Sequence, residues 1–105
     1  MPYTVVFAPE AEDQIADLYR YIAIEASPAV ALRYTDAVIS CCESLSTFPH
    51  RGTPRDDIRR GLRTTNYKGR TVIAFAVDDA SSVVSVLGVF YGGRDIETLL
   101  ADPLD

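Results

Sequence analysis

The densest apolar stretch of the chain falls into three segments, residues 61–67, 70–78 and 82–91. Each is rich in β-branched and aromatic residues, which are typical of β-strands. Lys68-Gly69 separates the first two segments, and Asp78-Asp79-Ala80-Ser81 separates the last two. Both connections contain turn-forming residues and are too short for a crossover helix. The pattern therefore predicts three consecutive antiparallel strands.

Both faces of this predicted sheet are apolar. Alternate positions in the second and third strands give two sets of side chains: Ile73, Phe75, Val77, Val84, Val86 and Phe90 on one face, and Val72, Ala74, Ala76, Val83, Leu87 and Val89 on the other. A sheet that is apolar on both faces must be covered on both faces. Helices upstream of the strands can cover one of them. We therefore expect the second face to be covered by the chain's own tail or by a second protein.

Upstream of the strands, the apolar spacing indicates one further strand and two helices. Residues 3–8 alternate as a strand, and residues 10–26 carry an apolar stripe at spacings of three and four. Ser27-Pro28 combines an N-cap residue with a proline at the first helical position. It starts a second helix that we expect to run to about residue 48, with Phe48 in its apolar stripe. The short connection predicts an antiparallel helix hairpin.

The order of these elements predicts the fold class. After the third strand of the meander, Ile96, Leu99 and Leu100 indicate a short amphipathic helix. We expect an α+β fold in which the helix hairpin packs on one face of a mainly antiparallel four-stranded sheet, with the first strand paired to the others. The 105 residues correspond to one domain, residues 1–105, in which residues 92–105 form a C-terminal tail.

Charge is unevenly distributed along the chain. The net charge is −5, yet residues 51–70 contain seven basic and two acidic residues, a local charge of +5. An acidic chain is unsuited to general nucleic-acid binding, so we do not expect this chain to bind nucleic acid on its own. The basic residues either solubilise a loop and pair with the acidic helices, or form a face that docks an acidic partner or a phosphate backbone. They are Arg51, Arg55, Arg59, Arg60, Arg63, Lys68 and Arg70.

Motifs of common catalytic sites are missing from the sequence. It has no glycine-rich phosphate loop, no nucleophile elbow and no paired histidines for zinc, so we expect no cofactor and no metal. His50 lies in a turn with proline and glycine, which favours a structural or exposed role over general-base catalysis. Cys41 and Cys42 are expected to be small helical residues, one inward and one outward. With no membrane span or signal peptide recognisable, we expect a cytoplasmic protein.

Two further groups of residues are candidates for specific contacts. Arg63 lies just inside a predicted strand, where we expect a carboxylate to hold it. The sequence Tyr91-Gly92-Gly93-Arg94-Asp95 ends the last strand and brings a phenol, a guanidinium and a carboxylate close together. This group either clamps the tail to the sheet or binds a phosphate or a protein.

Four segments, in this order along the chain, resemble toxins of bacterial type II toxin–antitoxin modules, the RelE/ParE superfamily, and its ParE-like branch in particular. They are residues 11–22, 45–52, 61–63 and 89–95. The resemblance covers nearly the whole chain. It implies a plasmid-stabilising type of module in which a ParD-like antitoxin wraps the toxin with its C-terminal part and binds operator DNA with its N-terminal part. Such a segment would also cover apolar sheet surface.

The resemblance implies one of two activities. ParE-like toxins inhibit DNA gyrase by binding it, whereas RelE-like toxins cleave messenger RNA in the ribosome. The acidic chain favours the first, with target contacts at Arg59, Arg60, Arg63, Lys68, Arg70, Tyr91 and Arg94. The alternative is an mRNA endonuclease that uses Arg63, Tyr91 and Arg94, and a third possibility is a toxin that retains only antitoxin binding. Many ParE-like chains have histidine at the position of Tyr91.

Overall fold

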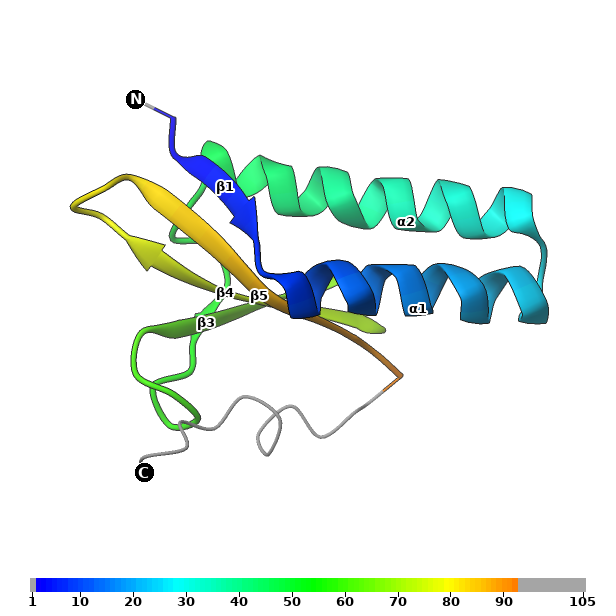
Figure 1. Ribbon diagram of the computed structural model, residues 1–105. Helices are drawn as coiled ribbons and strands as arrows, with labels where there is room; N and C mark the ends of the chain where they lie inside the picture. The colour runs from blue at the N-terminus through cyan, green and yellow to red at the C-terminus, as the bar shows by residue number, and fades with distance from the viewer. Residues whose placement is uncertain (1, 93–105) are drawn as a thin grey trace.

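The structure, a computed structural model, describes residues 2–92 and has two layers (Figure 1). One layer is a hairpin of two helices, α1 (Pro9–Glu25) and α2 (Pro28–Glu43), which continues into the short 3-10 helix η1 (Ser44–Ser46). The other layer is a sheet of five strands: β1 (Thr4–Phe7), β2 (Thr53–Pro54), β3 (Leu62–Tyr67), β4 (Thr71–Asp78) and β5 (Val83–Tyr91). This arrangement confirms the predicted α+β fold. The predicted helix at residues 96–100 lies outside the described residues.

The helix hairpin forms where the sequence provides starting residues and apolar stripes. Pro9 occupies the first turn of α1, where its missing N–H costs no intrahelical hydrogen bond. At the start of α2, the Ser27 hydroxyl accepts a hydrogen bond from the Val30 N–H at 3.2 Å. The two helices bury Ala11, Leu18, Ile22, Ala31, Thr35, Val38 and Cys42. Neither helix is long and apolar enough to cross a membrane, and the same holds for every helix within residues 2–92.

The second helix is shorter than predicted. It ends at Glu43 because the Ser44 hydroxyl donates to the Cys41 carbonyl at 2.6 Å and the chain tightens into η1. The Phe48 N–H then donates to the Ser44 carbonyl at 3.1 Å. As a result Phe48 leaves the apolar stripe in which it was predicted, and it is 57% exposed.

The strands follow the order β1-β5-β4-β3-β2 across the sheet (Figure 1). β3, β4 and β5 form the predicted antiparallel meander, and the two-residue β2 adds an edge strand that was not predicted. β1 pairs in parallel with β5, from Thr4 opposite Val83 to Phe7 opposite Val86. Because α1 and α2 run antiparallel, the end of the hairpin lies close to the start of β1. The loop toward β2 begins there. The sheet is therefore mostly antiparallel, with five strands where four were predicted and one parallel pair.

A β-bulge in β5 changes which side chains face the helices. The register between β4 and β5 shifts between Ala74 and Phe75, which leaves Leu87 without a partner in β4. The extra residue reverses the alternation beyond it. Val89 therefore lies in the helix-facing core, and Phe90 lies on the opposite face. The predicted placement of these two side chains was wrong for this reason.

The sheet face opposite the helices is partly covered by the segment between β2 and β3. In this segment Ile58 is only 8% exposed, and it packs with Leu62, Ala74 and Phe90. The sequence had assigned this cover to the chain's tail or to a second protein. Val6 of β1 points away from the helix-facing core and remains 43% exposed. Within residues 2–92, the chain thus covers the middle of this face and leaves the edge at β1 open.

Candidate functional site

The basic residues of the 51–70 segment do not gather on one surface. Arg59 and Arg60 are exposed in the turn before β3, whereas Lys68 and Arg70 are exposed in the turn after it. β3 has six residues, so the two pairs are separated by about 20 Å along the strand. Four of the predicted target-binding residues therefore lie in two separate pairs at opposite ends of β3.

Two of the three other arginines of this segment, Arg51 and Arg55, contact neighbouring side chains. Arg55 makes two hydrogen bonds to the Asp57 carboxylate, at 3.0 and 2.9 Å, and thereby lowers the pKa of that carboxyl. The Arg51 guanidinium lies 5.2 Å from the centre of the Phe48 ring and donates to the Ser44 hydroxyl at 3.0 Å. Both arginines therefore support local structure.

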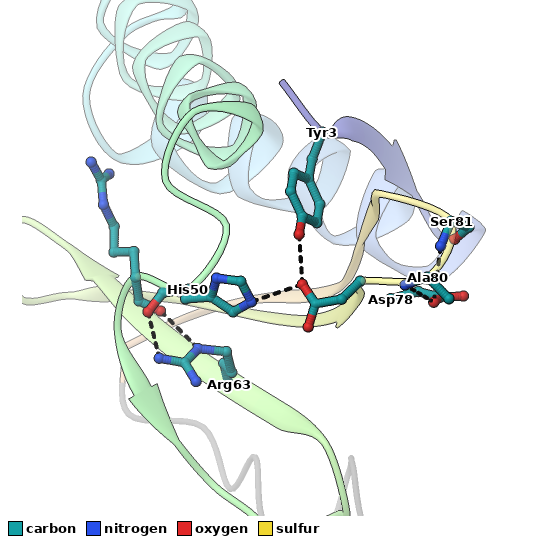
Figure 2. Close-up of polar contacts among 8 residues, drawn as sticks. Tyr3, His50, Arg63, Asp78, Ala80 and Ser81 are labelled. Carbon is teal, nitrogen blue, oxygen red and sulfur yellow. Dashed lines mark hydrogen bonds and ion pairs between the residues drawn. The ribbon is translucent and has the colours of Figure 1, made fainter. Parts of the chain in front are cut away.

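Arg63 holds the loop that follows the helices (Figure 2). Its Nη2 donates to the His50 carbonyl at 2.5 Å and its Nε donates to the Arg51 carbonyl at 3.1 Å. Nη2 also donates to the Gly52 carbonyl at 3.4 Å. The expectation that a carboxylate holds Arg63 was wrong, because the irregular loop offers three backbone carbonyls as acceptors for the guanidinium. Arg63 thus fixes residues 50–52 against β3.

Tyr91 lies in a cluster of aromatic rings between the sheet and the hairpin. The centre of its ring is 5.7 Å from that of Tyr21 in α1 and 6.2 Å from that of Tyr34 in α2. The Arg70 guanidinium lies 5.5 Å from the centre of the Tyr91 ring. Tyr34 also shares a hydrogen bond of 2.7 Å with the buried hydroxyl of Thr71. These contacts attach the end of β5 to both helices.

The residues predicted for a ribonuclease do not form one site within residues 2–92. Arg63 lies opposite Phe75 of β4, and Tyr91 lies opposite Thr71. The two β4 positions are four residues apart, which corresponds to about 13 Å along the strand. Arg94 lies outside the described residues, so its predicted role stays a prediction.

A groove with a volume of about 630 Å³ opens beside Tyr91. Its lining residues come from α1 and from the sheet: Gln14, Asp17, Leu18, Tyr21, Arg70, Val89, Tyr91 and Gly92. Gln14 Oε1 accepts a hydrogen bond from the Val89 N–H at 2.8 Å. The sequence did not reveal this groove, because only the register of β5 places Gln14 and Tyr21 beside a strand. The volume is in the range of ligand-binding pockets.

A polar cluster of Tyr3, His50 and Asp79 joins three segments that are distant in sequence (Figure 2). The Asp79 carboxylate accepts a hydrogen bond from the Tyr3 hydroxyl at 2.6 Å and lies 2.9 Å from His50 Nε2. The hydrogen bond from Tyr3 and the nearby His50 lower the pKa of Asp79, and the same hydrogen bond raises the pKa of Tyr3. His50 is exposed and paired, in line with its expected structural role. No local pattern connects these three residues, so sequence reasoning missed the cluster.

Metal ligands and cysteine thiols are the remaining chemical groups of interest among the described residues. Among residues 2–92 there is no group of three or more His, Cys, Asp or Glu side chains arranged to hold a metal ion. Cys42 is inward and Cys41 is partly exposed. Burial raises the pKa of the Cys42 thiol to about 12, which keeps it protonated and unreactive at neutral pH.

The fold and the sequence together identify the family. The profile of the ParE toxin of the type II toxin–antitoxin system parDE matches residues 5–96. The chain belongs to this family of toxins. No curated protein sequence matches this toxin significantly.

Three solved structures show the same fold. A toxin of the chromosomal ParDE system of P. aeruginosa is 15% identical, with 87% of this chain and 97% of that chain covered and a TM-score of 0.75. The toxin–antitoxin complex RelBE2 of Mycobacterium tuberculosis contains a chain that is 23% identical, with 87% and 99% covered and a TM-score of 0.63. A mutant of the E. coli toxin RelE in the free state is 13% identical, with 96% and 95% covered and a TM-score of 0.68.

Proposed function

We propose that this ParE-family toxin arrests growth by binding DNA gyrase, without a catalytic centre of its own, and that an antitoxin encoded beside it neutralises it. The family match supports the ParE-like alternative that the sequence resemblance implied. The similarity to a toxin from a ParDE system and to a chain of the RelBE2 complex supports an antitoxin as partner. We expect toxin, antitoxin and target to meet in the cytoplasm.

The engagement of Arg63 is the observation that favours binding over RNA cleavage. A ribonuclease must place cations and a proton donor around one phosphate. Here Arg63 donates to the carbonyls of His50 and Arg51 and lies four β4 positions away from Tyr91. These groups are therefore unavailable as a joint centre for phosphate chemistry.

The exposed basic pairs at the two ends of β3 are the proposed contacts with the target. Arg59 and Arg60 precede the strand, and Lys68 and Arg70 follow it. Exposed positive charges of this kind steer association with an acidic surface and determine the rate of encounter. Reversal of one such charge should therefore weaken inhibition more than reversal of an arginine on the helices.

A supercoiling assay with purified gyrase tests the proposal. We expect the wild-type toxin to block supercoiling at near-stoichiometric amounts. The Arg60→Glu variant should need about 5-fold more protein, since one exposed charge contributes about 1 kcal/mol to such a contact. Arg33→Glu on α2 is the matched control, because Arg33 is also exposed, and it should inhibit like the wild type. Undiminished supercoiling at large excess of wild-type toxin refutes the proposal.

Ribosome-dependent cleavage of messenger RNA is the alternative function, and the fold shared with E. coli RelE is the observation that favours it. Primer extension on a translated message separates the two. Codon-specific breaks that disappear in the Tyr91→Phe variant, together with active gyrase, would establish the alternative. An uncut message with inhibited gyrase supports our proposal, and growth without arrest during expression of the toxin alone counts against both activities.

A further inference from the structure

Phe48 is an exposed aromatic side chain in the turn that follows the helices. More than half of its surface, 57%, is accessible to solvent. Together with Pro49, His50 and Arg51 it lines an open hollow of about 380 Å³. A single exposed apolar side chain is ordinary in a folded protein. The groups beside the ring therefore decide whether it belongs to a binding surface.

Arg51 lies over this ring and carries a charge that the described residues do not neutralise. Its guanidinium is 5.2 Å from the centre of the Phe48 ring, and its Nη1 donates to the Ser44 hydroxyl at 3.0 Å. A guanidinium has five N–H donors, and no other hydrogen bond of this one is formed within residues 2–92. None of the ion pairs within residues 2–92 includes Arg51. The exposed ring is thus paired with a cation that has donors to spare.

The end of α2 fixes this pair in place. The Phe48 N–H donates to the Ser44 carbonyl at 3.1 Å, and the Arg51 N–H donates to the Phe48 carbonyl at 3.2 Å. The Ser44 hydroxyl that accepts from Arg51 itself donates to the Cys41 carbonyl at 2.6 Å. None of these bonds involves Arg63, so they do not depend on that side chain. Side chains that are ordered in advance lose less conformational entropy on binding.

The turn lies at the end of the sheet where β3 begins. His50 Nε2 is 2.9 Å from the carboxylate of Asp79, which directly follows β4. β3 and β4 are antiparallel, so the end of β4 lies beside the start of β3. Arg59 and Arg60, two of the proposed target contacts, are exposed just before that start. This end of the sheet therefore combines three exposed arginines with one exposed aromatic ring.

We propose that Phe48 and Arg51 are the central contact of the toxin with gyrase, and that they bind a gyrase segment with a carboxylate beside an apolar side chain. This inference rests on the proposed function. The carboxylate bonds to the free donors of Arg51, and the apolar side chain packs on the exposed part of the Phe48 ring. Aromatic residues and arginine are the types enriched at the energetic centre of protein interfaces. Arg59 and Arg60 steer the same acidic surface toward this contact.

Surface plasmon resonance with immobilised gyrase tests this contact. Phe48→Ala should bind about 10-fold more weakly or worse, whereas Phe48→Tyr, which keeps the ring, should bind like the wild type. Leu32 on α2 is similarly exposed, at 55%, so Leu32→Ala is the matched control and should not change the affinity. Arg51→Met should bind about 5-fold more weakly, and its association rate should depend less on salt, because one charge of the contact is lost.

Urea unfolding shows whether the variants are folded. The midpoint of Phe48→Ala should stay close to that of the wild type, because most of the ring is already in water. A folded Phe48→Ala with the affinity of the wild type overturns this contact and leaves the proposed function intact. If the wild-type toxin neither binds nor inhibits gyrase, both proposals fail.

Two other occupants of this surface are separable in the same set of proteins. A Phe48→Ala variant that still inhibits gyrase but no longer binds the product of the neighbouring reading frame assigns the surface to the antitoxin. A free toxin that sediments as a dimer, and becomes a monomer in Phe48→Ala without loss of gyrase binding, assigns it to a second copy of the chain. Either result overturns the proposal.

Discussion

Replacing Arg63 by methionine removes the donors that fix residues 50–52 while it keeps most of the aliphatic stem. The wild type makes two good hydrogen bonds, to the His50 and Arg51 carbonyls at 2.5 and 3.1 Å, and a long one of 3.4 Å to Gly52. A hydrogen bond from a charged donor contributes about 1.5–3 kcal/mol. The side chain is only partly buried, so in the variant water offsets part of the free energy that these hydrogen bonds contribute. We therefore expect a loss of about 2 kcal/mol, roughly 8–12 °C in Tm for a domain of this size.

Urea unfolding followed by circular dichroism measures this loss. The free energy of unfolding of Arg63→Lys should lie between those of the wild type and Arg63→Met, because a lysine reaches one carbonyl as a point charge and cannot span several acceptors. Arg60→Met is the matched control, since Arg60 is exposed, and its stability should stay within about 0.5 kcal/mol of the wild type. A change of the same small size in Arg63→Met would refute the view that this side chain holds the loop.

The same variants separate a structural role of Arg63 from a contact with the target. If Arg63 only holds the loop, Arg63→Met should inhibit gyrase normally at temperatures where it is folded. A folded variant that has lost inhibition would instead restore Arg63 as a contact residue, as the sequence predicted. The comparison is made at equal folded fraction, so that lost stability is not counted as lost activity.

Three further predictions concern the sheet and its turns. A Cβ at Gly88 would lie 2.5 and 2.6 Å from atoms of the Phe90 ring, so Gly88→Ala should cost about 1–3 kcal/mol in urea unfolding, and Phe90→Leu in the same chain should recover part of it; additive losses would contradict this. Phe75 is fully buried, so Phe75→Ala should cost about 3–5 kcal/mol, and a loss below about 1 kcal/mol would show that the core is misplaced. The hydrogen bond from Tyr3 lowers the pKa of Asp79 below 3.8, so this contact stabilises the fold above about pH 5 and is lost as the pH falls below 3.8. The Tm difference between wild type and Tyr3→Phe should therefore disappear at low pH, and a difference that persists in acid excludes this linkage.

The elements that the sequence predicted correctly depend on local patterns. Apolar alternation and the Lys68-Gly69 turn were sufficient to predict β3 and β4 as neighbours, and Ser27-Pro28 was sufficient to start α2. Each of these signals acts within a few residues. The hairpin on a mostly antiparallel sheet follows from them, because short connections leave few ways to arrange the strands.

The features that the sequence did not predict depend on contacts between distant segments. The bulge at Leu87 is specified by packing against β4 and cannot be seen in the alternation of β5 alone. The cover provided by Ile58 comes from one apolar side chain in a charged segment. The groove exists because β1 ends after four paired residues while β5 continues. Its position depends on how the two strands pair, so neither strand's sequence reveals it alone.

For the candidate site, the sequence predicted some of the residues that take part but not their partners or arrangement. Tyr91 was singled out and does line the groove, as does Arg70. Arg63 was singled out for its charge, yet its partners are backbone carbonyls, which no side-chain pattern reveals. Whether the basic pairs contact the target stays a prediction.

The pairing of β1 with β5 also has a consequence for synthesis of the toxin. Residues 4–7 emerge from the ribosome well before their partners, residues 83–86. A nascent chain cannot complete the sheet until those residues have also emerged, because so distant a pairing must wait for its second strand. The sheet therefore cannot be completed before residues 83–86 have left the ribosome, so the groove beside Tyr91, which depends on β5, forms only after that point.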